Sequence, residues 1–380
     1  NNHDVHVLDY RNNVVTGFTR MYRLLINLRD ILLTEQLPRF AHDEIRILVR
    51  PTRFYSLLLA ASFHPDLLRD ALERDRFFDR LWEVVEQWPD LARLIPAERQ
   101  DLFSGDIPLF AAFPDSHTIF SSDKEPLIDL FDTPGLDLAQ QQVQHLNERD
   151  LVRQIWIIEA SLATLQMGSE DQIGKVLPLN PTQPPVSREQ MIALAKTIGV
   201  RLEELALQND EGACWLGVNL FREKSWGLFP VGTNLYDGAS GIAFFLAYLG
   251  TITGEARFTS LAKLALALIR TQIASIRTQI EGQKKDSPNT GIGTFDGWCS
   301  FIYLLTHLSM LWNEPAFIHE TEELIEYLPT LISRDEHLDI VNGSAGCILS
   351  LLSFYAIHPS PRILEIAIQC GDHLLATAQA

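Results

Sequence analysis

Hydrophobic residues recur at intervals of three and four positions along much of the chain, which is the spacing of amphipathic helices. The segments with this pattern cover residues 14–33, 66–86, 136–146 and 149–165. A region rich in proline and aspartate, from Pro108 to Pro134, separates the second segment from the third and is expected to be loop. Asn147 stands where a side chain would cap the last helix. These patterns predict a mainly α-helical protein.

Residues 167–187 interrupt the helical pattern. This stretch contains four prolines and two glycines, and its composition is typical of a linker. Ser187 ends it and forms a Ser-x-x-Gln capping box with Gln190, which predicts that a new helix begins there. We therefore divide the chain into a first domain of residues 1–166 and a second domain of residues 188–380.

The second domain contains an internal repeat. Three glycine-centred segments, at Gly238, Gly297 and Gly343, lie 59 and 46 positions apart, and this period fits one αα-hairpin per repeat. The helix after each glycine is apolar nearly all round, so we expect it to be buried, with glycine allowing backbones to approach closely. Stacked hairpins form either an open solenoid or a closed αα-toroid. The amphipathic second helices are expected near residues 258–276, 316–332 and 361–378.

Charge is distributed unevenly along the chain. There are 31 lysines and arginines against 49 aspartates and glutamates, a net charge of −18, so we expect no nucleic acid or anionic membrane as a general partner. Residues 1–60 nevertheless carry eight arginines, no lysine and only six acidic residues. Because the guanidinium fork matches phosphate and carboxylate, this segment suggests local anion binding. The alternative is a set of ordinary surface arginines on helices.

Cysteine usage and hydropathy bear on location. The four cysteines form no Cys-x-x-Cys pair, which favours a reducing cytoplasm over a disulfide framework. No apolar run reaches the roughly 20 residues of a transmembrane helix.

The eleven histidines form no tight ligand set, so we expect no zinc site made wholly within these residues. The first methionine is Met21, and no signal peptide precedes it, which we interpret as a piece of a longer protein.

A candidate phosphate site lies in the sequence RILVRPTRFY, residues 46–55. Arg46, Arg50 and Arg53 offer paired donors, and Thr52 and Tyr55 each add a hydroxyl. The proline within this stretch breaks regular structure and can expose backbone N–H groups. The alternative is a solvated basic turn.

Aspartates stand near the start of each predicted inner helix: Asp237, Asp296 and Asp339. Aspartate at a helix N-terminus is usually a cap that faces the positive end of the helix dipole. If the inner helices converge on one cavity, however, these carboxylates face a common centre and can exchange protons there. The sequence leaves both interpretations open.

Long ordered blocks of the chain resemble the class II lanthipeptide synthetases, the bifunctional LanM enzymes. The stretches DYRNNVVTGFTRMYRLL, RILVRPTRFY and SFHPDLLRDALERDRFFDRLW look like the C-terminal part of the family's kinase-like dehydratase domain. The stretches LYDGASGIAFFLAYLGTITGE, FDGWCSFIYLLTHLSMLWNEP and LDIVNGSAGCILSLLSFY look like the first repeats of its LanC-type cyclase domain. The resemblance implies an incomplete LanC-like αα-toroid after the dehydratase segment.

The resemblance also implies a chemistry. Such an enzyme dehydrates Ser and Thr of a ribosomally made leader–core precursor peptide through phosphorylation and phosphate elimination, then adds Cys thiols to form lanthionine rings. Arg46 and Thr52 match the family's elimination residues, Arg50 is expected to help bind phosphate, and Asp339, in a D-x-x-x-G setting with Gly343, matches a cyclase acid–base residue. ATP with Mg²⁺ and zinc are expected for the intact enzyme, with their binding motifs outside this chain. The isolated chain is expected to be inactive.

Two other functions remain open at this point. The repeats can form a non-catalytic, helical peptide-binding module. Asp237 and Asp296 can instead form the acid–base pair of an αα-toroid glycosidase, although this hypothesis does not account for the arginine-rich block. Neither the precursor peptide nor the oligomeric state follows from the sequence.

Overall fold

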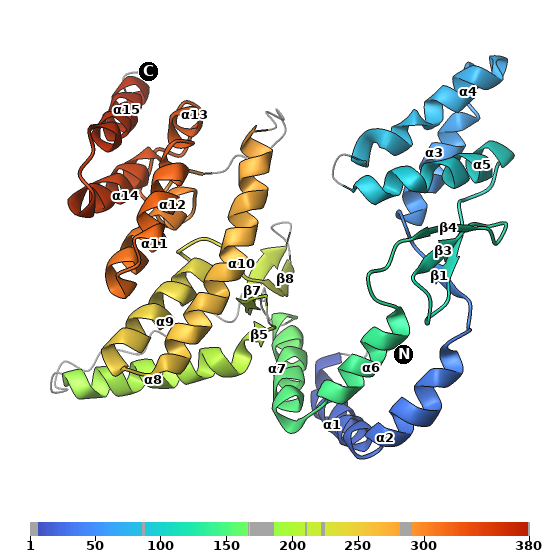
Figure 1. Ribbon diagram of the computed structural model, residues 1–380, viewed down its shortest axis with the longest axis horizontal. Helices are drawn as coiled ribbons and strands as arrows, with labels where there is room; N and C mark the ends of the chain where they lie inside the picture. The colour runs from blue at the N-terminus through green and yellow to red at the C-terminus, as the bar shows by residue number, and fades with distance from the viewer. Residues whose placement is uncertain are drawn as a thin grey trace, which may run out of the picture. The chain divides into compact units, whose positions relative to one another are not determined.

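The computed structural model describes residues 7–85, 88–165, 167, 186–209, 211–221, 225–281 and 291–378. The chain divides into two compact units, one formed by Asp9–Ile155 and the other by Trp156–Ala380 together with Asn1–Leu8 (Figure 1). Most of the predicted linker, residues 167–187, lies outside the described residues.

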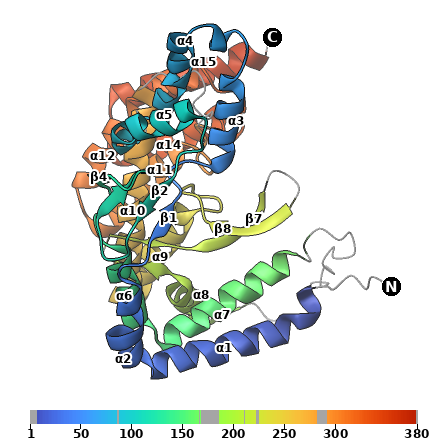
Figure 2. The same cartoon turned by 90° about the vertical axis from the view of Figure 1, so that its right-hand side faces the viewer.

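The first unit begins and ends with helices. They are α1 (Arg11–Asn27), α2 (Arg29–Ile31), α3 (Thr52–Ser62), α4 (Ala71–Phe77), α5 (Ile95–Ser104), α6 (Gly135–His145) and the start of α7 (Glu148–Thr164). Asn147 Oδ1 accepts a hydrogen bond of 2.9 Å from the Asp150 backbone, which confirms the predicted cap of α7. Tyr22 donates to the Asp150 carboxylate, so α1 lies against the first turn of α7 (Figure 2).

The helix predicted over residues 66–86 is broken into shorter pieces. A 3-10 turn at Leu67–Arg69 precedes α4, and a second 3-10 segment, Phe78–Val84, follows it. Asp70 adopts an extended backbone and accepts a 2.9 Å hydrogen bond from the Leu72 N–H, so it starts α4 afresh. The apolar spacing was therefore correct for helical turns, but an internal N-cap divides the predicted helix.

The region from Pro108 to Pro134 is not simply loop, as the sequence suggested. It supplies three short strands that join an earlier one in an antiparallel sheet of order β1-β2-β3-β4. The strands are β1 (Ile45–Ile47), β2 (Phe110–Ala112), β3 (Thr118–Phe120) and β4 (Pro126–Asp129). Strands of three or four residues are too short to display an alternating pattern, which explains why the sequence did not predict them.

Two apolar clusters form the core of the first unit. The larger one holds residues from α3, α5 and the 3-10 segment after α4: Tyr55, Leu58, Phe78, Leu81, Ile95 and Leu102. The smaller one holds Leu94, Phe110 and Ile119, with Ile47 of β1 packed against it. The sheet and the helices are thus held by separate clusters that meet near the start of α5.

Three helical hairpins dominate the second unit (Figure 1). Among the first helices of the pairs, α11 is the most buried, with nine buried residues among its fourteen, against seven among fifteen in α9 and six among fourteen in α14. Leu349 and Leu352 of α14 are exposed, so this helix is not buried all round as predicted. These hairpins confirm the predicted mainly α fold with apolar inner helices. The pairs are α9 (Ala239–Thr253) with α10 (Ala256–Glu281), α11 (Cys299–Trp312) with α12 (Ala316–Ile325) and α13 (Leu328–Ile332), and α14 (Ser344–Ile357) with α15 (Pro361–Ala378).

The helix α8 (Arg188–Leu205) and two small antiparallel strand pairs complete the second unit. Ser187 Oγ accepts from the Gln190 N–H at 3.2 Å, and the Gln190 side chain accepts from the Ser187 N–H at 2.9 Å, which confirms the predicted capping box. The strand pairs are β5 (Leu207–Gln208) with β6 (Ala213–Cys214), and β7 (Leu216–Phe221) with β8 (Ser225–Pro230).

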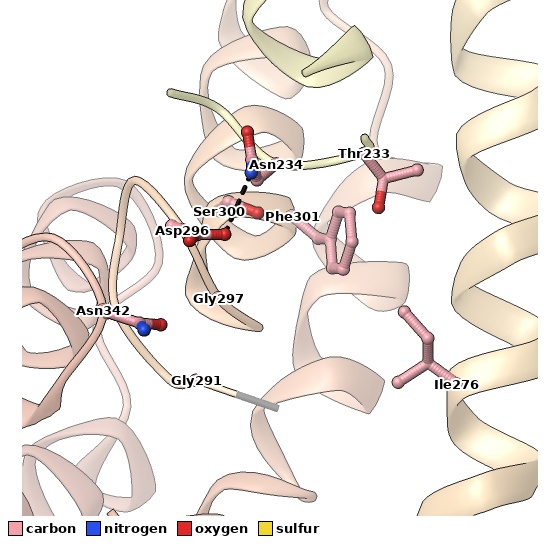
Figure 3. Close-up of a pocket in the computed structure, with 9 residues that line it drawn as sticks. All are labelled: Thr233, Asn234, Ile276, Gly291, Asp296, Gly297, Ser300, Phe301 and Asn342. Atoms are coloured by element: carbon pink, nitrogen blue, oxygen red, sulfur yellow. Dashed lines mark hydrogen bonds between the residues drawn. The ribbon is translucent and has the colours of Figure 1, made fainter. Parts of the chain in front are cut away.

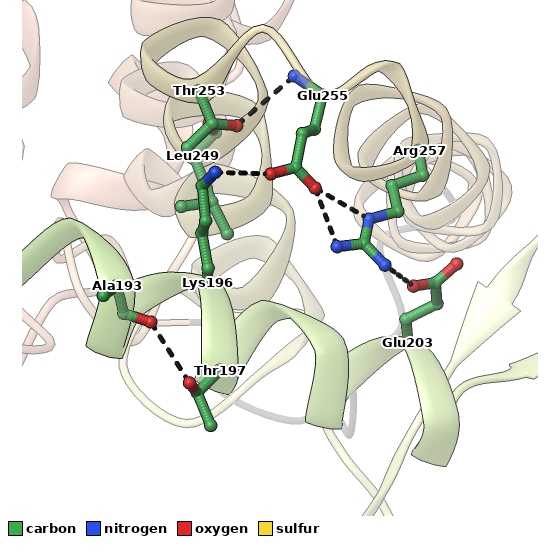
Figure 4. Close-up of polar contacts among 8 residues, drawn as sticks. All are labelled: Ala193, Lys196, Thr197, Glu203, Leu249, Thr253, Glu255 and Arg257. Carbon is green, nitrogen blue, oxygen red and sulfur yellow. Dashed lines mark hydrogen bonds and ion pairs between the residues drawn. The ribbon is translucent and has the colours of Figure 1, made fainter.

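An ion-pair network ties α8 to the first hairpin (Figure 4). Glu255, at the turn between α9 and α10, lies 2.7 Å from Lys196 and 2.7 Å from Arg257, and Arg257 reaches Glu203 at 3.4 Å. Hydrogen bonds from Lys196 and Arg257 lower the pKa of Glu255. The network places α8 against the hairpin at an exposed edge. Across the described ranges, no helix is both long and apolar enough to cross a membrane.

Candidate functional site

Arg46 lies on β1, opposite Ala111 of β2. Its neighbour Ile47 packs against the smaller apolar cluster, and because alternate strand residues face opposite sides, Arg46 points to the other face of the sheet. The side chain of Arg46 is exposed. Within the described ranges it has no hydrogen-bonding or ion-pair partner, so its guanidinium is available to a ligand.

Thr52 is the first residue of α3 and is exposed. The preceding Pro51 has an extended backbone, with φ −55° and ψ 129°, which turns the chain from the sheet into the helix. The first-turn N–H groups of a helix lack intrahelical acceptors and, with the helix dipole, favour an anion. Arg46 and Thr52 thus stand on either side of one strand-to-helix connection.

Arg50 lies in the same connection but is buried, with 6% of its surface exposed. Its Nε and Nη2 donate to the two oxygens of Glu98 at 2.6 and 3.2 Å, and Nη2 also donates to the Leu81 carbonyl at 2.9 Å. Tyr55 donates to the same carboxylate at 2.5 Å, and burial together with Glu98 raises the pKa of Tyr55. This geometry favours a structural role for Arg50 over the predicted contact with phosphate.

Glu98 is the residue that sequence reasoning missed in this region. It sits in α5, 48 positions from Arg50, and is fully buried. A lone glutamate carries no local sign of burial, because glutamates are ordinarily exposed. Its role becomes visible only when α5 packs beneath the connection between β1 and α3.

In the second unit, the loops before α9, α11 and α14 meet at one cavity of about 250 Å³ (Figure 3). The expected convergence of the inner-helix starts is therefore present in the structure. The described lining residues are Thr233, Asn234, Ile276, Gly291, Asp296, Gly297, Ser300, Phe301 and Asn342.

Hydrogen bonds join the three loops. Asn234 Nδ2 donates to Asp296 Oδ1 at 2.9 Å and links the first loop to the second. The Asp296 N–H donates to the Val341 carbonyl at 2.8 Å, and the Ile292 N–H donates to the Asn342 carbonyl at 2.9 Å, linking the second loop to the third. These contacts hold side chains from three separate repeats around one cavity.

Glycines permit this close approach, as the sequence predicted. A Cβ at Gly293 would lie 2.2 Å from the Val341 carbonyl oxygen of the next repeat, and one at Gly346 would lie 2.7 Å from the Thr294 nitrogen of the preceding repeat. No side chain fits at such separations, so these positions require glycine. The glycine-centred segments thus mark where backbones of neighbouring repeats touch.

The three aspartates are not equivalent in the structure. Among the described residues only Asp296 lines the cavity, so the geometry offers no acid–base pair of Asp237 and Asp296 within it. Asp339 is exposed, and its Oδ1 accepts from the Asn342 N–H at 2.7 Å. Asp339 therefore stands next to a residue that lines the cavity, without lining it.

Asp335 is a second residue that sequence reasoning missed. It is buried, and its Oδ2 accepts from the Ser344 N–H at 2.7 Å and from the Ser344 hydroxyl at 2.5 Å, so it caps α14. Burial alone would raise the pKa of Asp335, but the hydrogen bonds from Ser344 and His337 outweigh it and lower the pKa. Asp335 is nine positions from Ser344, outside any local capping pattern.

The described residues do not fit a zinc site. No group of three or more His, Cys, Asp or Glu side chains in the described ranges is arranged to hold a metal ion. Cys299, Cys347 and Cys370 are buried in the core. Contact with Cys299 and burial raise the pKa of Cys347, and contact with Cys347 and burial raise that of Cys370.

Comparison with known proteins assigns both units to described families. Residues 1–112 match the model of a domain of unknown function (DUF4135), and residues 230–380 match lanthionine synthetase C-like protein. A curated relative, the lacticin 481/lactococcin biosynthesis protein LcnDR2 of Lactococcus lactis subsp. lactis, is 23% identical over 240 residues. The match covers 63% of this chain and 25% of the relative, so the chain spans about a quarter of that protein's length. A DUF4135 segment followed by a LanC-like segment, together with this relative, supports a LanM-type, class II lanthipeptide synthetase.

Proposed function

We propose that this chain contributes to both reactions of lanthionine formation on a ribosomally made precursor peptide. In the first, Ser and Thr are phosphorylated and lose phosphate to give dehydroamino acids; in the second, Cys thiols add to these to form thioether rings. The observation that carries the proposal is the pairing of two elements on one chain. These are the exposed Arg46–Thr52 connection in the segment matching DUF4135 and the convergent loops of the LanC-like segment.

The elimination step suits the chemistry of the Arg46–Thr52 connection. A base removes the Cα proton of the phosphorylated residue, the Cβ–O bond breaks, and phosphate leaves with the electron pair. Charge then grows on the departing phosphate. Arg46 can neutralise this charge, and the Thr52 hydroxyl with the first-turn N–H groups of α3 can donate hydrogen bonds to it. Arg50 contributes indirectly, because its buried pair with Glu98 holds the connection in place.

The cyclisation step is proposed to use Asp339. A Cys sulfur bonds to Cβ of the dehydroamino acid, and Cα then takes up a proton. Asp339 offers an exposed carboxylate at the loop that contributes Asn342 to the cavity, and one of its oxygens is held by the Asn342 N–H. This fixes the carboxylate relative to the cavity while its other oxygen remains able to exchange a proton.

Cofactors belong to the proposal for the complete enzyme. ATP with Mg²⁺ supplies the phosphoryl group, and zinc lowers the pKa of a substrate thiol when bound. We propose that the complete enzyme binds both; the described residues do not themselves form a metal site. The cellular location proposed for the enzyme is the reducing cytoplasm.

The decisive test is Arg46→Met in the full-length synthetase, with its precursor peptide analysed by mass spectrometry. We expect peptide carrying added phosphoryl groups to accumulate, because phosphorylation continues while elimination slows by about 10²–10³-fold. Arg39→Met, at another exposed arginine of the same unit, is the matched control and should give normal dehydration. Only unmodified peptide would mean that Arg46 serves an earlier step, and normal dehydrated peptide would remove it from the mechanism.

A non-catalytic peptide-binding module remains the second candidate for the LanC-like segment. The observation that favours it is that Asp339 already has a structural task, accepting from Asn342. Asp339→Asn distinguishes the two functions. The amide oxygen can still accept from the Asn342 N–H, but the side chain no longer carries a charge. Dehydrated, poorly cyclised product supports catalysis by Asp339; normal ring formation supports the binding module.

A further inference from the structure

Ser300 is an anomaly in the first turn of α11. Its side chain is completely covered from solvent, yet its Oγ has no hydrogen-bond partner among the described residues. Two other buried hydroxyls on the same helix are satisfied, since Thr306 donates to the Ile302 carbonyl at 2.6 Å and Ser309 to the Thr306 carbonyl at 2.7 Å. A buried hydroxyl without a partner is costly and rare, so the position of Ser300 requires an explanation.

Ser300 lines the cavity where the three loops meet, beside Asp296 (Figure 3). Asp296 Oδ1 accepts from Asn234, whereas Oδ2 has no partner and the carboxylate no cation within the described ranges. Asn342, from the third loop, presents a side-chain amide to the same space. The polar side of the cavity therefore offers a carboxylate oxygen, a hydroxyl oxygen and an amide oxygen from different directions.

The opposite side of the cavity is apolar. Phe301 of α11 and Ile276 of α10 supply it, and Phe301 is 4% exposed (Figure 3). A ligand that fits both sides has an aliphatic stem and a terminal group rich in donors. Among biological groups, a primary ammonium has three donors and no acceptor, and its tetrahedral geometry suits acceptors in several directions better than the planar fork of a guanidinium does.

We propose that this cavity binds a primary ammonium on an aliphatic stem, with Asp296 and Ser300 as its main acceptors and Phe301 and Ile276 against the stem. In the enzyme, the group is a lysine side chain of the peptide substrate. The assignment to a lysine of the peptide rests on the proposed function, whereas the binding of a primary ammonium does not. This ammonium site is separate from Asp339. By holding the lysine, it would position the peptide for reaction at Asp339.

The test uses n-butylamine as the probe and the 380-residue chain as the protein, with binding followed by calorimetry at neutral pH. The amine is then charged, since its pKa resembles that of lysine, about 10. Asp296→Asn should weaken binding by about 10- to 100-fold, because it removes a hydrogen bond to a charged group, and Ser300→Ala by about 2- to 10-fold. Asp237→Asn, an exposed aspartate that does not line the cavity, is the matched control and should leave affinity unchanged.

Two results would overturn the assignment. One is equal binding of n-butanol, which has the same stem without the charge; the other is equal affinity in Asp296→Asn, Ser300→Ala and Asp237→Asn. Thermal unfolding of each variant checks the fold. If the Asp296→Asn variant is unfolded, the affinity of the Ser300→Ala variant tests the proposal instead. This substitution removes only a hydroxyl that has no partner among the described residues.

A second arm identifies the source of the amine. Two precursor-like peptides, identical except for lysine or norleucine at one position, are compared for KM with the full-length synthetase. A lower KM for the lysine peptide that is lost in Ser300→Ala supports the peptide assignment. Equal KM values, with butylamine binding retained, would overturn it in favour of a free amine. No modification of either peptide, with butylamine binding retained, would count against the proposed function and not against the cavity.

Discussion

The two units place their charged residues in opposite ways. In Asp9–Ile155, Arg50 and Glu98 form a buried ion pair beneath a connection whose Arg46 is exposed and without a partner among the described residues. In the LanC-like unit the exposed Asp296 faces a cavity, and its charge has no cation there among the described residues. The buried charges described above hold the backbone in place, and the exposed unpaired charges are the ones available to a ligand.

The comparison extends to the caps of the inner helices. Asp335 is buried and both of its oxygens accept hydrogen bonds, from Ser344 and His337, whereas Asp339, four positions later, is exposed with one oxygen engaged. Aspartate therefore stabilises the start of a helix at position 335, whereas at position 339 it keeps a carboxylate oxygen that can bind a ligand. Burial, not residue type, separates the two roles.

The largest expected effect comes from breaking the buried pair. Glu98→Ala leaves the Arg50 charge buried without a partner and should lower the free energy of unfolding of the first unit by about 3–5 kcal/mol. Chemical denaturation followed by tryptophan fluorescence measures it. Glu148→Ala, which removes an exposed partner of Arg23, is the control and should have a far smaller effect. Similar losses in the two variants would show that burial does not distinguish these pairs.

A smaller effect is expected at the cap of α14. Asp335→Asn should destabilise the second unit by about 1–3 kcal/mol, because a charged acceptor for the Ser344 N–H and hydroxyl is lost. The folded-state pKa of Asp335 lies below its ordinary value of 3.8, so this stabilisation is complete above about pH 3.8 and is lost as the pH falls through the lowered value. Acid titration of unfolding in the wild type and in Asp335→Asn measures the difference. Identical acid profiles would contradict this role.

The smallest effect concerns His307, which lies on α11 and forms a 2.8 Å hydrogen bond with Tyr248 of α9. Burial lowers the pKa of His307 from its ordinary value of 6.5. Its contribution to stability is therefore complete above about pH 6.5 and declines as the pH falls, because the unfolded chain takes up the proton first. Thermal unfolding between pH 7.5 and 5 should show a slope that His307→Phe reduces. An unchanged slope would assign the pH dependence to other groups.

Local features of the fold could be predicted from the sequence because helix geometry fixes their spacing. The Asn147 cap and the capping box of Ser187 with Gln190 are examples, since each depends on residues three positions apart. The short strands after Pro108 could not be predicted in the same way. Three or four residues do not establish a period, and the strands form only because the chain returns to β1.

For the candidate sites, the sequence alone determined which segments matter. It singled out the block around Arg46 and Thr52, and the glycine-centred loops, because residue type and repetition are visible along the chain. Only the tertiary structure decided that Arg50 is buried against Glu98, that Asp296 rather than Asp339 lines the cavity, and that Ser300 has no partner among the described residues. The physical reason is distance along the chain: caps and periods depend on near neighbours, whereas burial and hydrogen-bond partners depend on residues that meet only after packing.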